Sequence, residues 1–246
     1  MRILVVNCNT SEETTRAIER SATAAALPGT EIVMAAPTWG VESAEGYYES
    51  FISAAAVLDV LTMRADDADA VVLAGYGEHG REGARQLLDI PVVDITEASA
   101  DIASLIGHRF GVVTTLSSTL AGIGDSLLTS GDSGRCAGIR AADVPVLALH
   151  DDVESTARLL VADARALIEA GADVIVLGCA GMAGLDRALE ALIPVPVIDP
   201  VSAAVGMAEL LVRMGKSTSK AGPFAPPSRT KLRPGWPLTN AVVAAA

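Results

Sequence analysis

The stretch ADAVVLAGYGEHG (residues 68–80) decides the fold, because the chain repeats it as GADVIVLGCAGMAG (residues 171–184). In each version an aspartate (Asp69 or Asp173) leads into a short apolar run, and a glycine-rich segment follows the run. A β-branched run that is apolar on both faces indicates a strand of a buried parallel sheet. The repeat also contains one chemical difference, since Cys179 in the second version aligns with Gly75 in the first.

The repeat extends on both sides of these strands. IPVVD (residues 90–94) aligns with VPVID (residues 195–199), and RILVVNCNT (residues 2–10) aligns with RFGVVTTLS (residues 109–117). Three similar pairs of segments in the same order indicate an internal duplication.

Short apolar runs alternate with helical patterns along the chain. Strands are expected at residues 3–7, 31–35, 70–75, 92–94, 110–115, 144–148, 174–179 and 197–199, and helices at residues 12–26, 48–65, 153–170 and 203–214. This alternation predicts an α/β fold with mainly parallel sheets covered on both faces. We expect two pseudo-symmetric halves, residues 1–97 and 98–208, with residues 209–246 (the end of a helix and a tail) completing the first half. Ligands bind at the carboxyl ends of such strands, so the active site should lie in the cleft between the halves.

The composition narrows the class of protein. The chain is 50% hydrophobic but only 3% aromatic, which suits packing through small residues and argues against disorder. A net charge of −12 disfavours nucleic acid and anionic membranes as partners, because both attract concentrated positive charge. No apolar run approaches the roughly 20 residues that span a bilayer. An odd number of cysteines, and no signal-peptide pattern after Met1, predict a cytoplasmic protein.

Cys179 is the strongest candidate for chemistry. It follows an expected strand, precedes an expected helix and lies between Gly178 and Gly181. A thiol at a helix N-terminus experiences partial positive charge, which favours the thiolate below the ordinary thiol pKa of about 8.5. The alternative is a buried structural cysteine, which is a common role for this residue type.

At these residues the sequence resembles a known family. IVLGCAGMAG (175–184), PVPVIDPVSAAVGMAELL (194–211) and TSKAGPF (218–224) are similar to the hydantoin racemases of the aspartate/glutamate racemase superfamily, a group that includes allantoin racemase. MRILVVNCNTS (1–11) resembles that family's opening, usually an Asn-Pro-Asn-Thr loop. The resemblance covers residues 1–230. It implies two Rossmann-like halves, a homo-oligomer, and cofactor-independent racemisation of a small molecule by two cysteines on opposite sides of an acidic carbon.

One of the two cysteines implied by the resemblance is missing. Cys179 matches the family's second cysteine, whereas the first, normally within Ala-Cys-Phe-Gly-Asp-Pro-Gly, matches Gly75, which cannot transfer a proton. Either another group serves the second face of the substrate, or the reaction needs only one face. His79, in place of a family proline, is our first candidate because imidazole exchanges protons near neutral pH. Glu78, and Cys8 in place of the proline of the first loop, are the alternatives, and His79 and Glu78 also suit a solvent-facing loop.

The other residues at the strand ends suit substrate binding. Their neutral donors and acceptors match the carbonyls and N–H groups of a hydantoin or a developing enolate, and they are Asn7, Asn9, Thr10, Gly75, Tyr76, Thr114, Thr115, Gly178, Ala180 and Gly181. The alternative role of Asn9 and Thr10 is helix capping, since TSEE (10–13) has the pattern of a capping box. Asp94 and Asp199 end paired strands and are expected to orient turns.

The sequence therefore predicts a racemase that acts at the acidic carbon of 5-substituted hydantoins or allantoin-like compounds. A one-cysteine enzyme similar to arylmalonate decarboxylases and a binding protein without catalysis are the alternatives. His79, His108 and His150 show no metal-ligand spacing with cysteines or carboxylates, so no metal site is expected. The chain contains neither a P-loop nor a Gly-x-Ser-x-Gly elbow, and no cofactor is expected.

Overall fold

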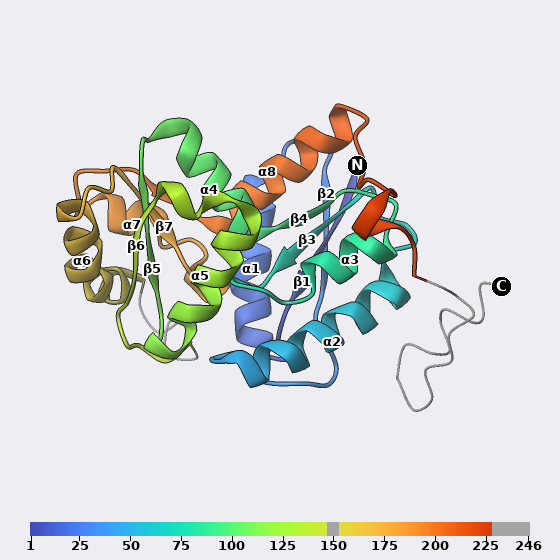
Figure 1. Cartoon of the computed structure of the whole chain (residues 1–246), viewed down its shortest axis with the longest axis horizontal. Helices are drawn as coiled ribbons and strands as arrows, with labels where there is room; N and C mark the ends of the chain where they lie inside the picture. Colours follow the sequence, from blue (N-terminus) through green and yellow to red (C-terminus); the bar gives the residue numbers. More distant parts are fainter. Residues whose placement is uncertain (147–152, 228–246) are drawn as a thin grey trace.

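The computed structural model describes residues 1–146 and 153–227 (Figure 1). The strands are β1 (Arg2–Asn7), β2 (Glu31–Ala35), β3 (Ala70–Ala74), β4 (Val92–Asp94), β5 (Phe110–Thr114), β6 (Cys136–Ala141), β7 (Val174–Leu177) and β8 (Val197–Ile198). The helices are α1 (Glu12–Ala25), α2 (Tyr47–Arg64), α3 (Arg81–Leu87), α4 (Ile95–Ile106), α5 (Leu120–Ser130), α6 (Val153–Glu169), α7 (Asp186–Glu190) and α8 (Pro200–Arg213). Strands and helices alternate, as the apolar pattern predicts.

The strands form two parallel sheets with the same order. The first sheet runs β2-β1-β3-β4, and the second runs β6-β5-β7-β8. Every pairing between neighbouring strands is parallel. The aligned segments of the sequence therefore occupy equivalent places, β1 with β5, β3 with β7 and β4 with β8. The expected α/β fold with two pseudo-symmetric halves is confirmed.

Helices cover both faces of each sheet. In the first half, α1 and α8 pack on one face, and α2 and α3 pack on the other. In the second half, α4 and α5 pack on one face, and α6 and α7 pack on the other. Apart from Arg2, Asn7 and Thr114 at strand ends, the residues of the central strands β1, β3, β5 and β7 are apolar and buried, as expected where both faces of a parallel sheet are shielded from water.

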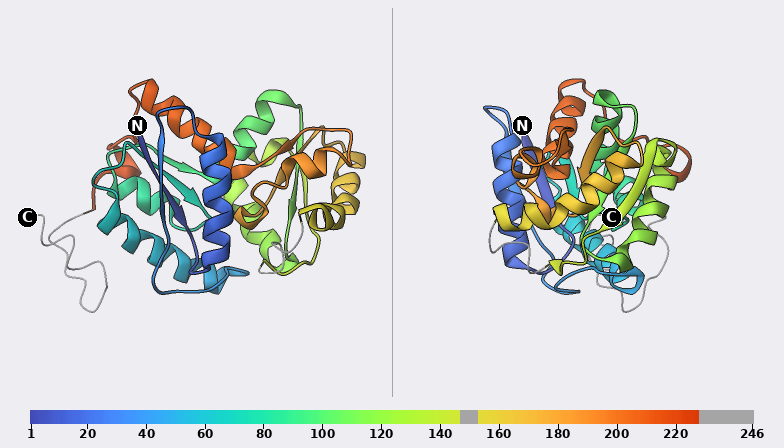
Figure 2. Two further views of the ribbon diagram at one scale, coloured as in Figure 1. Left: turned by 180° about the vertical axis from the view of Figure 1, so that it is seen from behind. Right: turned by 90° about the vertical axis from the view of Figure 1, so that its left-hand side faces the viewer.

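The two halves exchange one helix each. Helix α4 follows β4 of the first sheet, yet its Ala100 and Ala103 pack in the core of the second sheet. Helix α8 follows β8 of the second sheet, and its Ala204 and Val205 pack in the core of the first. The two helices also contact each other where the halves join (Figure 2). The expected boundaries after residues 97 and 208 fall inside these helices.

An aspartate begins each exchanged helix. The Asp94 carboxylate accepts hydrogen bonds from the backbone N–H groups of Thr96 and Glu97 in the first turn of α4. Asp199 likewise accepts two backbone hydrogen bonds in the first turn of α8. Each carboxylate satisfies N–H groups that have no partner within the helix. Both aspartates are therefore N-caps of helices, and this is how they orient the chain after each strand.

The edge strand of the second sheet lies elsewhere than expected. It is β6, whereas Val144 and Pro145, the start of the strand expected at residues 144–148, are not in strand conformation. Leu147 and Ala148 lie outside the described residues. Strand β6 consists mainly of half-buried small residues and has an irregular register against β5. It therefore lacks the long apolar run that marks the central strands, which explains why the pattern missed it.

The segment after α8 lies against the first half. Thr218 Oγ1 donates a hydrogen bond to the carbonyl of Ile90 at 2.9 Å, and Lys220 Nζ donates to the carbonyl of Arg85 at 2.8 Å. Residues 228–246 of the expected tail lie outside the described residues. In the part of the chain that is described, no helix is both long and apolar enough to cross a membrane.

Candidate active site

A pocket lies where the carboxyl ends of the two sheets meet. Its volume, counted over the positions open to the centre of a water-sized sphere, is about 40 Å³. Most of the expected site residues line it, namely Asn7, Asn9, Gly75, Tyr76, His79, Thr114, Thr115, Gly178, Cys179, Ala180 and Gly181. Cys8 lines it as well. The topology thus brings together strand ends that are about half a chain apart in sequence.

Several lining residues were not expected. They are Thr14, Ala44, Ala74, Thr119, Ile123 and Val146. Thr14 and Thr119 lie near the start of the helices that follow β1 and β5. Because they are only a few residues beyond these strand ends in sequence, their positions could have been used to predict them. The others are apolar, and no local pattern distinguishes them from core residues.

Cys179 follows β7 and starts a single 3-10 turn, Ala180–Met182. Its Sγ accepts a hydrogen bond from the backbone N–H of Gly181 at 3.4 Å. Burial raises the pKa of this thiol to about 11, although the N–H groups of Gly181 and Met182 act in the opposite direction. The expected lowering of the pKa is therefore wrong. One short turn supplies two N–H groups but not the dipole of a full helix, and burial outweighs them.

Gly75 leaves no room for a side chain. A Cβ atom built on it would lie 2.5 Å from His79 Cδ2, 2.7 Å from Cys8 Cβ and 2.9 Å from Cys8 Sγ. Non-bonded carbon atoms prefer separations of about 3.5–4.0 Å. The side-chain space that Cys179 uses in the second half is therefore filled in the first half by two other side chains. This is why one version of the repeat has a thiol and the other has glycine.

Strand register brings Cys8 into this space. Strands β1 and β3 are neighbours, and Asn7 pairs with Ala74. Cys8 and Gly75 come next on the two strands, so they face the same side of the sheet. Cys8 is only 8% exposed. Burial and, to a lesser extent, the charge of Cys179 raise the pKa of the Cys8 thiol to about 12.

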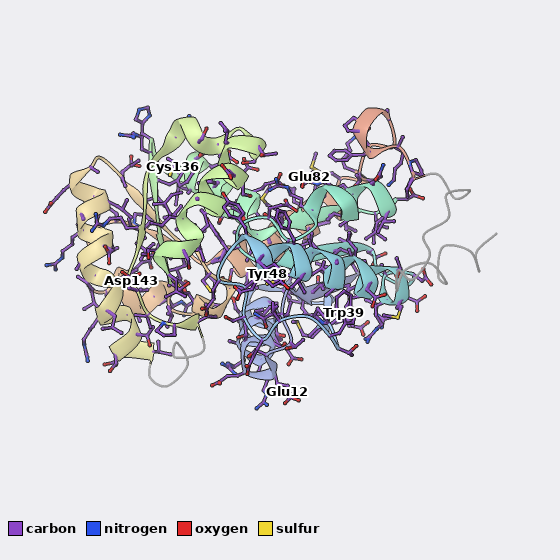
Figure 3. All side chains as sticks on the ribbon, turned by 60° about the horizontal axis from the view of Figure 1, so that its bottom comes forward. Glu12, Trp39, Tyr48, Glu82, Cys136 and Asp143 are labelled. Carbon is purple, nitrogen blue, oxygen red and sulfur yellow. The ribbon has the colours of Figure 1, made fainter. Side chains whose placement is uncertain are left out.

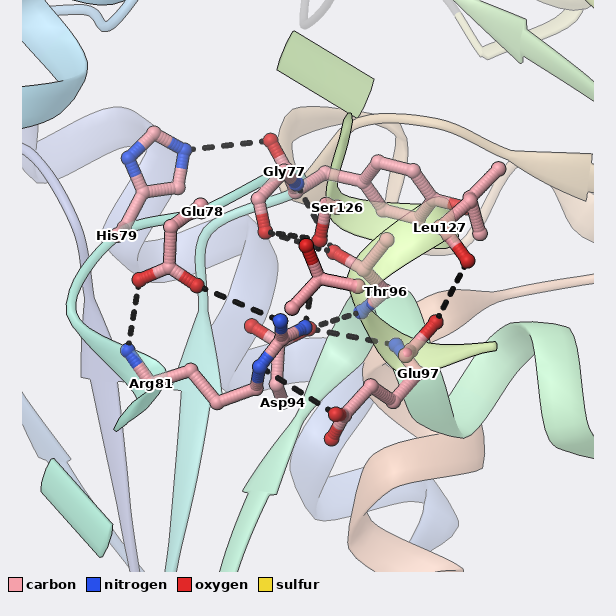
Figure 4. A network of polar contacts seen from close by, with 12 residues as sticks. Gly77, Glu78, His79, Arg81, Asp94, Thr96, Glu97, Ser126 and Leu127 are labelled. Atoms are coloured by element: carbon pink, nitrogen blue, oxygen red, sulfur yellow. Dashed lines mark hydrogen bonds and ion pairs between the residues drawn. The ribbon is translucent and has the colours of Figure 1, made fainter. Parts of the chain in front are cut away.

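His79 is buried beside the same pocket, so the interpretation of it as a solvent-facing residue is wrong. Its Nε2 lies 3.2 Å from the backbone carbonyl oxygen of Tyr76 (Figure 4). Its ring atom nearest to the Gly75 side-chain position is the carbon Cδ2. Burial lowers the pKa of the imidazole to about 4, which outweighs the opposite effect of the Tyr76 carbonyl. The ring is therefore neutral at pH 7.

The polar residues at the strand ends divide between two roles. Asn7 Nδ2 donates to Asn9 Oδ1 at 2.9 Å, which holds the loop after β1, and Thr114 Oγ1 donates to the carbonyl of Gly178 at 2.9 Å. In contrast, Asn9 Nδ2 and Thr115 Oγ1 line the pocket and make no hydrogen bond in the described part of the chain. These two groups are available to a ligand.

Thr10 and Glu78 lie outside this pocket. The backbone N–H and Oγ1 of Thr10 both donate to the carbonyl of Val41, at 2.9 Å and 3.2 Å. The residue that caps α1 is Ser11, one position later than the expected capping box would place it. Glu78 accepts hydrogen bonds from two backbone N–H groups at the start of α3. Burial raises its pKa to about 7, and its carboxyl group is directed toward α3 (Figure 4).

The pocket carries no formal charge on the described residues that line it. None of them is Asp, Glu, Lys or Arg, and His79 is neutral at pH 7. Across residues 1–146 and 153–227, no group of three or more His, Cys, Asp or Glu side chains is arranged to hold a metal ion. A neutral pocket favours a neutral ligand, because a buried charge without a partner is costly.

Known proteins resemble this chain in sequence and in fold. The family model of the Asp/Glu/Hydantoin racemases matches residues 3–208. The chain belongs to this family. A hydantoin racemase from a Pseudomonas strain is 38% identical over 231 residues, which cover 93% of each chain. The resemblance seen in the sequence is confirmed, and the enzyme belongs to the racemase class of isomerases.

Solved structures of this racemase family have the same fold. The allantoin racemase from Pseudomonas fluorescens has a TM-score of 0.92 and 49% identity, covering 95% of this chain and 100% of that one. The allantoin racemase from Klebsiella pneumoniae has a TM-score of 0.91 and 41% identity, covering 98% of both chains. Arylmalonate decarboxylase is more distant, with a TM-score of 0.55 and 18% identity. That likeness shows the fold alone.

Proposed function

We propose that this racemase interconverts the enantiomers of 5-substituted hydantoins, a class that includes allantoin, by proton transfer at ring carbon C5. The observation that carries the proposal is the thiol of Cys179 beside a pocket whose described lining has no formal charge. The relatives named as hydantoin and allantoin racemases support the same substrate class. The proposed reaction uses protein side chains alone.

The proposed reaction begins at Cys179. Its thiolate takes the C5 proton, and the C–H electron pair moves onto the neighbouring ring carbonyl to give an enolate. Neutral donors stabilise the negative oxygen most strongly when they are already in position and shielded from water. Asn9 Nδ2 and Thr115 Oγ1 are two such donors without another partner in the described part of the chain. A proton delivered to the opposite face of C5 then completes the inversion.

The lack of charge distinguishes the proposed substrate from others. A free amino acid brings a carboxylate and an ammonium group, and an arylmalonate brings two carboxylates. Buried carboxylates are normally met by arginine, lysine or several backbone donors. No arginine or lysine is found among the described lining residues. A neutral hydantoin ring therefore suits the pocket better than an amino acid or an arylmalonate.

Optical rotation of single enantiomers of allantoin and 5-benzylhydantoin, together with proton NMR in D2O, tests the proposal. We expect wild type to abolish the rotation faster than the uncatalysed reaction and to exchange C5–H for deuterium. Cys179→Ala should lose racemisation by at least about 100-fold, the lower range for acid–base catalysis.

The matched control is Cys136→Ala. Cys136 lies on β6 in the second half (Figure 3), and it is not among the residues that line the pocket. This variant should racemise at the wild-type rate. Release of carbon dioxide from an arylmalonate without hydantoin racemisation would replace the proposal with a decarboxylase. A thermal shift on ligand addition without any turnover would replace it with a binding protein.

A further inference from the structure

The first half of the pocket contains a thiol that the family pattern does not predict. Relative to that pattern, Cys8 and His79 stand in place of prolines, and Gly75 stands in place of a cysteine. Both side chains approach the same point, the position of a Cβ atom at residue 75. The three departures are therefore one structural change, in which the loss of one side chain makes room for two others.

The Cys8 thiol lies where the missing thiol would begin. Its Sγ is 2.9 Å from the Cβ position of residue 75, and Cys8 and Cys179 line the same pocket. The charge of Cys179 contributes to the electrostatic environment of Cys8, as expected for groups that face a common space. The sulfur of Cys8 hydrogen-bonds to no other residue in the described part of the chain, so it is free to act on a ligand.

His79 is less suited to act on the substrate. It turns the carbon Cδ2 toward the Gly75 position, and Nε2 lies against the carbonyl of Tyr76. A general acid or base must bring the atom that carries the proton within reach of the substrate. The imidazole instead packs next to Cys8, which makes His79 a positioning residue for the thiol.

We infer that Cys8 is the second proton-transfer residue, acting on the face of C5 opposite Cys179; this inference rests on the proposed racemisation. In one direction the Cys179 thiolate takes the C5 proton and becomes a thiol. The Cys8 S–H bond breaks, its proton bonds to C5 on the other face, and Cys8 becomes a thiolate. In the reverse direction the two residues exchange roles. Proton exchange with water restores the starting state after each turnover, so atoms and charge balance.

Deuterium exchange into each enantiomer separates the two faces. In Cys8→Ala we expect racemisation to fall by at least about 100-fold, while one enantiomer still exchanges C5–H for deuterium without inversion, since Cys179 still reaches its proton. In Cys179→Ala we expect the other enantiomer to show such exchange. Cys8→Ser keeps the shape of the side chain and should behave like Cys8→Ala. Loss of activity in both variants would therefore not be explained by a cavity that unfolds the protein.

The controls distinguish this inference from the proposed function. Wild type that racemises no hydantoin overturns the proposed function. Wild type that racemises, with Cys8→Ala and Cys8→Ser both retaining at least half of that rate, overturns the inference alone. His79→Asn should slow racemisation less than Cys8→Ala does, because it disturbs the position of Cys8 without removing the thiol. One-sided exchange in His79→Asn, instead of in the Cys8 variants, would assign the second face to His79.

Discussion

The Cys8 sulfur lies 2.9 Å from the point where a Cβ atom of residue 75 would stand, so these two positions cannot both carry a full side chain. We therefore expect Gly75→Ala to lower the free energy of unfolding by about 1–3 kcal/mol, as overpacking does in a dense core. Gly75→Cys should also lower the racemisation rate, because the added side chain displaces Cys8. Urea unfolding and optical rotation measure the two effects.

Gly206→Ala is the matched control for this prediction. A Cβ atom at Gly206 meets no other atom within 4 Å, and the residue lies inside α8. Alanine there should raise the free energy of unfolding by about 0.5–1 kcal/mol through helix propensity. A Gly75→Cys variant that is more active than wild type would contradict this prediction, because it would show that Cys8 and His79 can move to accommodate the new side chain without loss of activity.

The sequence predicted the parts of this structure that depend on local pattern. Central strands buried on both faces carry an apolar run wherever they occur, so the sheets and the position of Cys179 followed from that run. Edge strand β6 is half-buried and lacks such an apolar run, so the sequence pattern did not predict it. The raised pKa of Cys179 depends on how the two halves enclose it, which no local motif records.

The position of Cys8 needed information on strand order. The alignment of the repeats relates Cys8 to Thr115, and this places it beside the cleft. Only the pairing of β1 with β3 shows that Asn7 lies beside Ala74, so that the next residues after the two strands, Cys8 and Gly75, also lie side by side. A first strand that lies between the second and third strands is common in α/β sheets. Assuming this strand order would therefore have placed Cys8 beside Gly75 from the sequence.

Arg81 is 1% exposed and is the first residue of α3, directly after the loop of residues 75–80. Its side chain lies among carboxylates (Figure 4). Its guanidinium is 3.7 Å from Asp94 Oδ1 and 3.3 Å from Glu97 Oε1. Arg81→Met leaves Asp94 without a cation, whereas Glu97 keeps its ion pair with Arg85. Breaking a buried ion pair in this way costs about 3–5 kcal/mol. Urea unfolding at pH 8 should show this loss.

The loss should depend on pH because of Asp94. Burial raises the pKa of Asp94 to about 7 even though Arg81 lowers it, so the unpaired acid is tolerated when protonated and destabilises the fold as pH rises through 7. The effect of Arg81→Met should thus be smaller at pH 5 than at pH 8. Arg16→Met is the control, since Arg16 pairs with Glu12 on an exposed face, where such pairs contribute at most about 1 kcal/mol. Equal losses in the two variants would contradict the ion-pair assignment.

The pH dependence of kcat/KM tests which group is the base. With the pKa of Cys179 near 11, the thiolate fraction rises about tenfold per pH unit below that value, and kcat/KM should follow it between pH 6 and 8. His79, with a pKa of about 4, is already deprotonated throughout this range. A profile that stays flat from pH 6 to 8 would therefore count against the thiolate and favour the imidazole.

His79 should also make the fold sensitive to acid. Burial lowers its pKa from 6.5 to about 4, so its contribution to stability is full above pH 6.5 and is lost as the pH falls toward 4. The shift corresponds to about 3 kcal/mol. His79→Gln cannot take up this proton, so its free energy of unfolding should fall less than that of wild type between pH 7 and pH 4.5. His108→Gln, at an exposed position, should retain the wild-type dependence. If His79→Gln and wild type lose equal stability over this interval, the imidazole is not held neutral by burial.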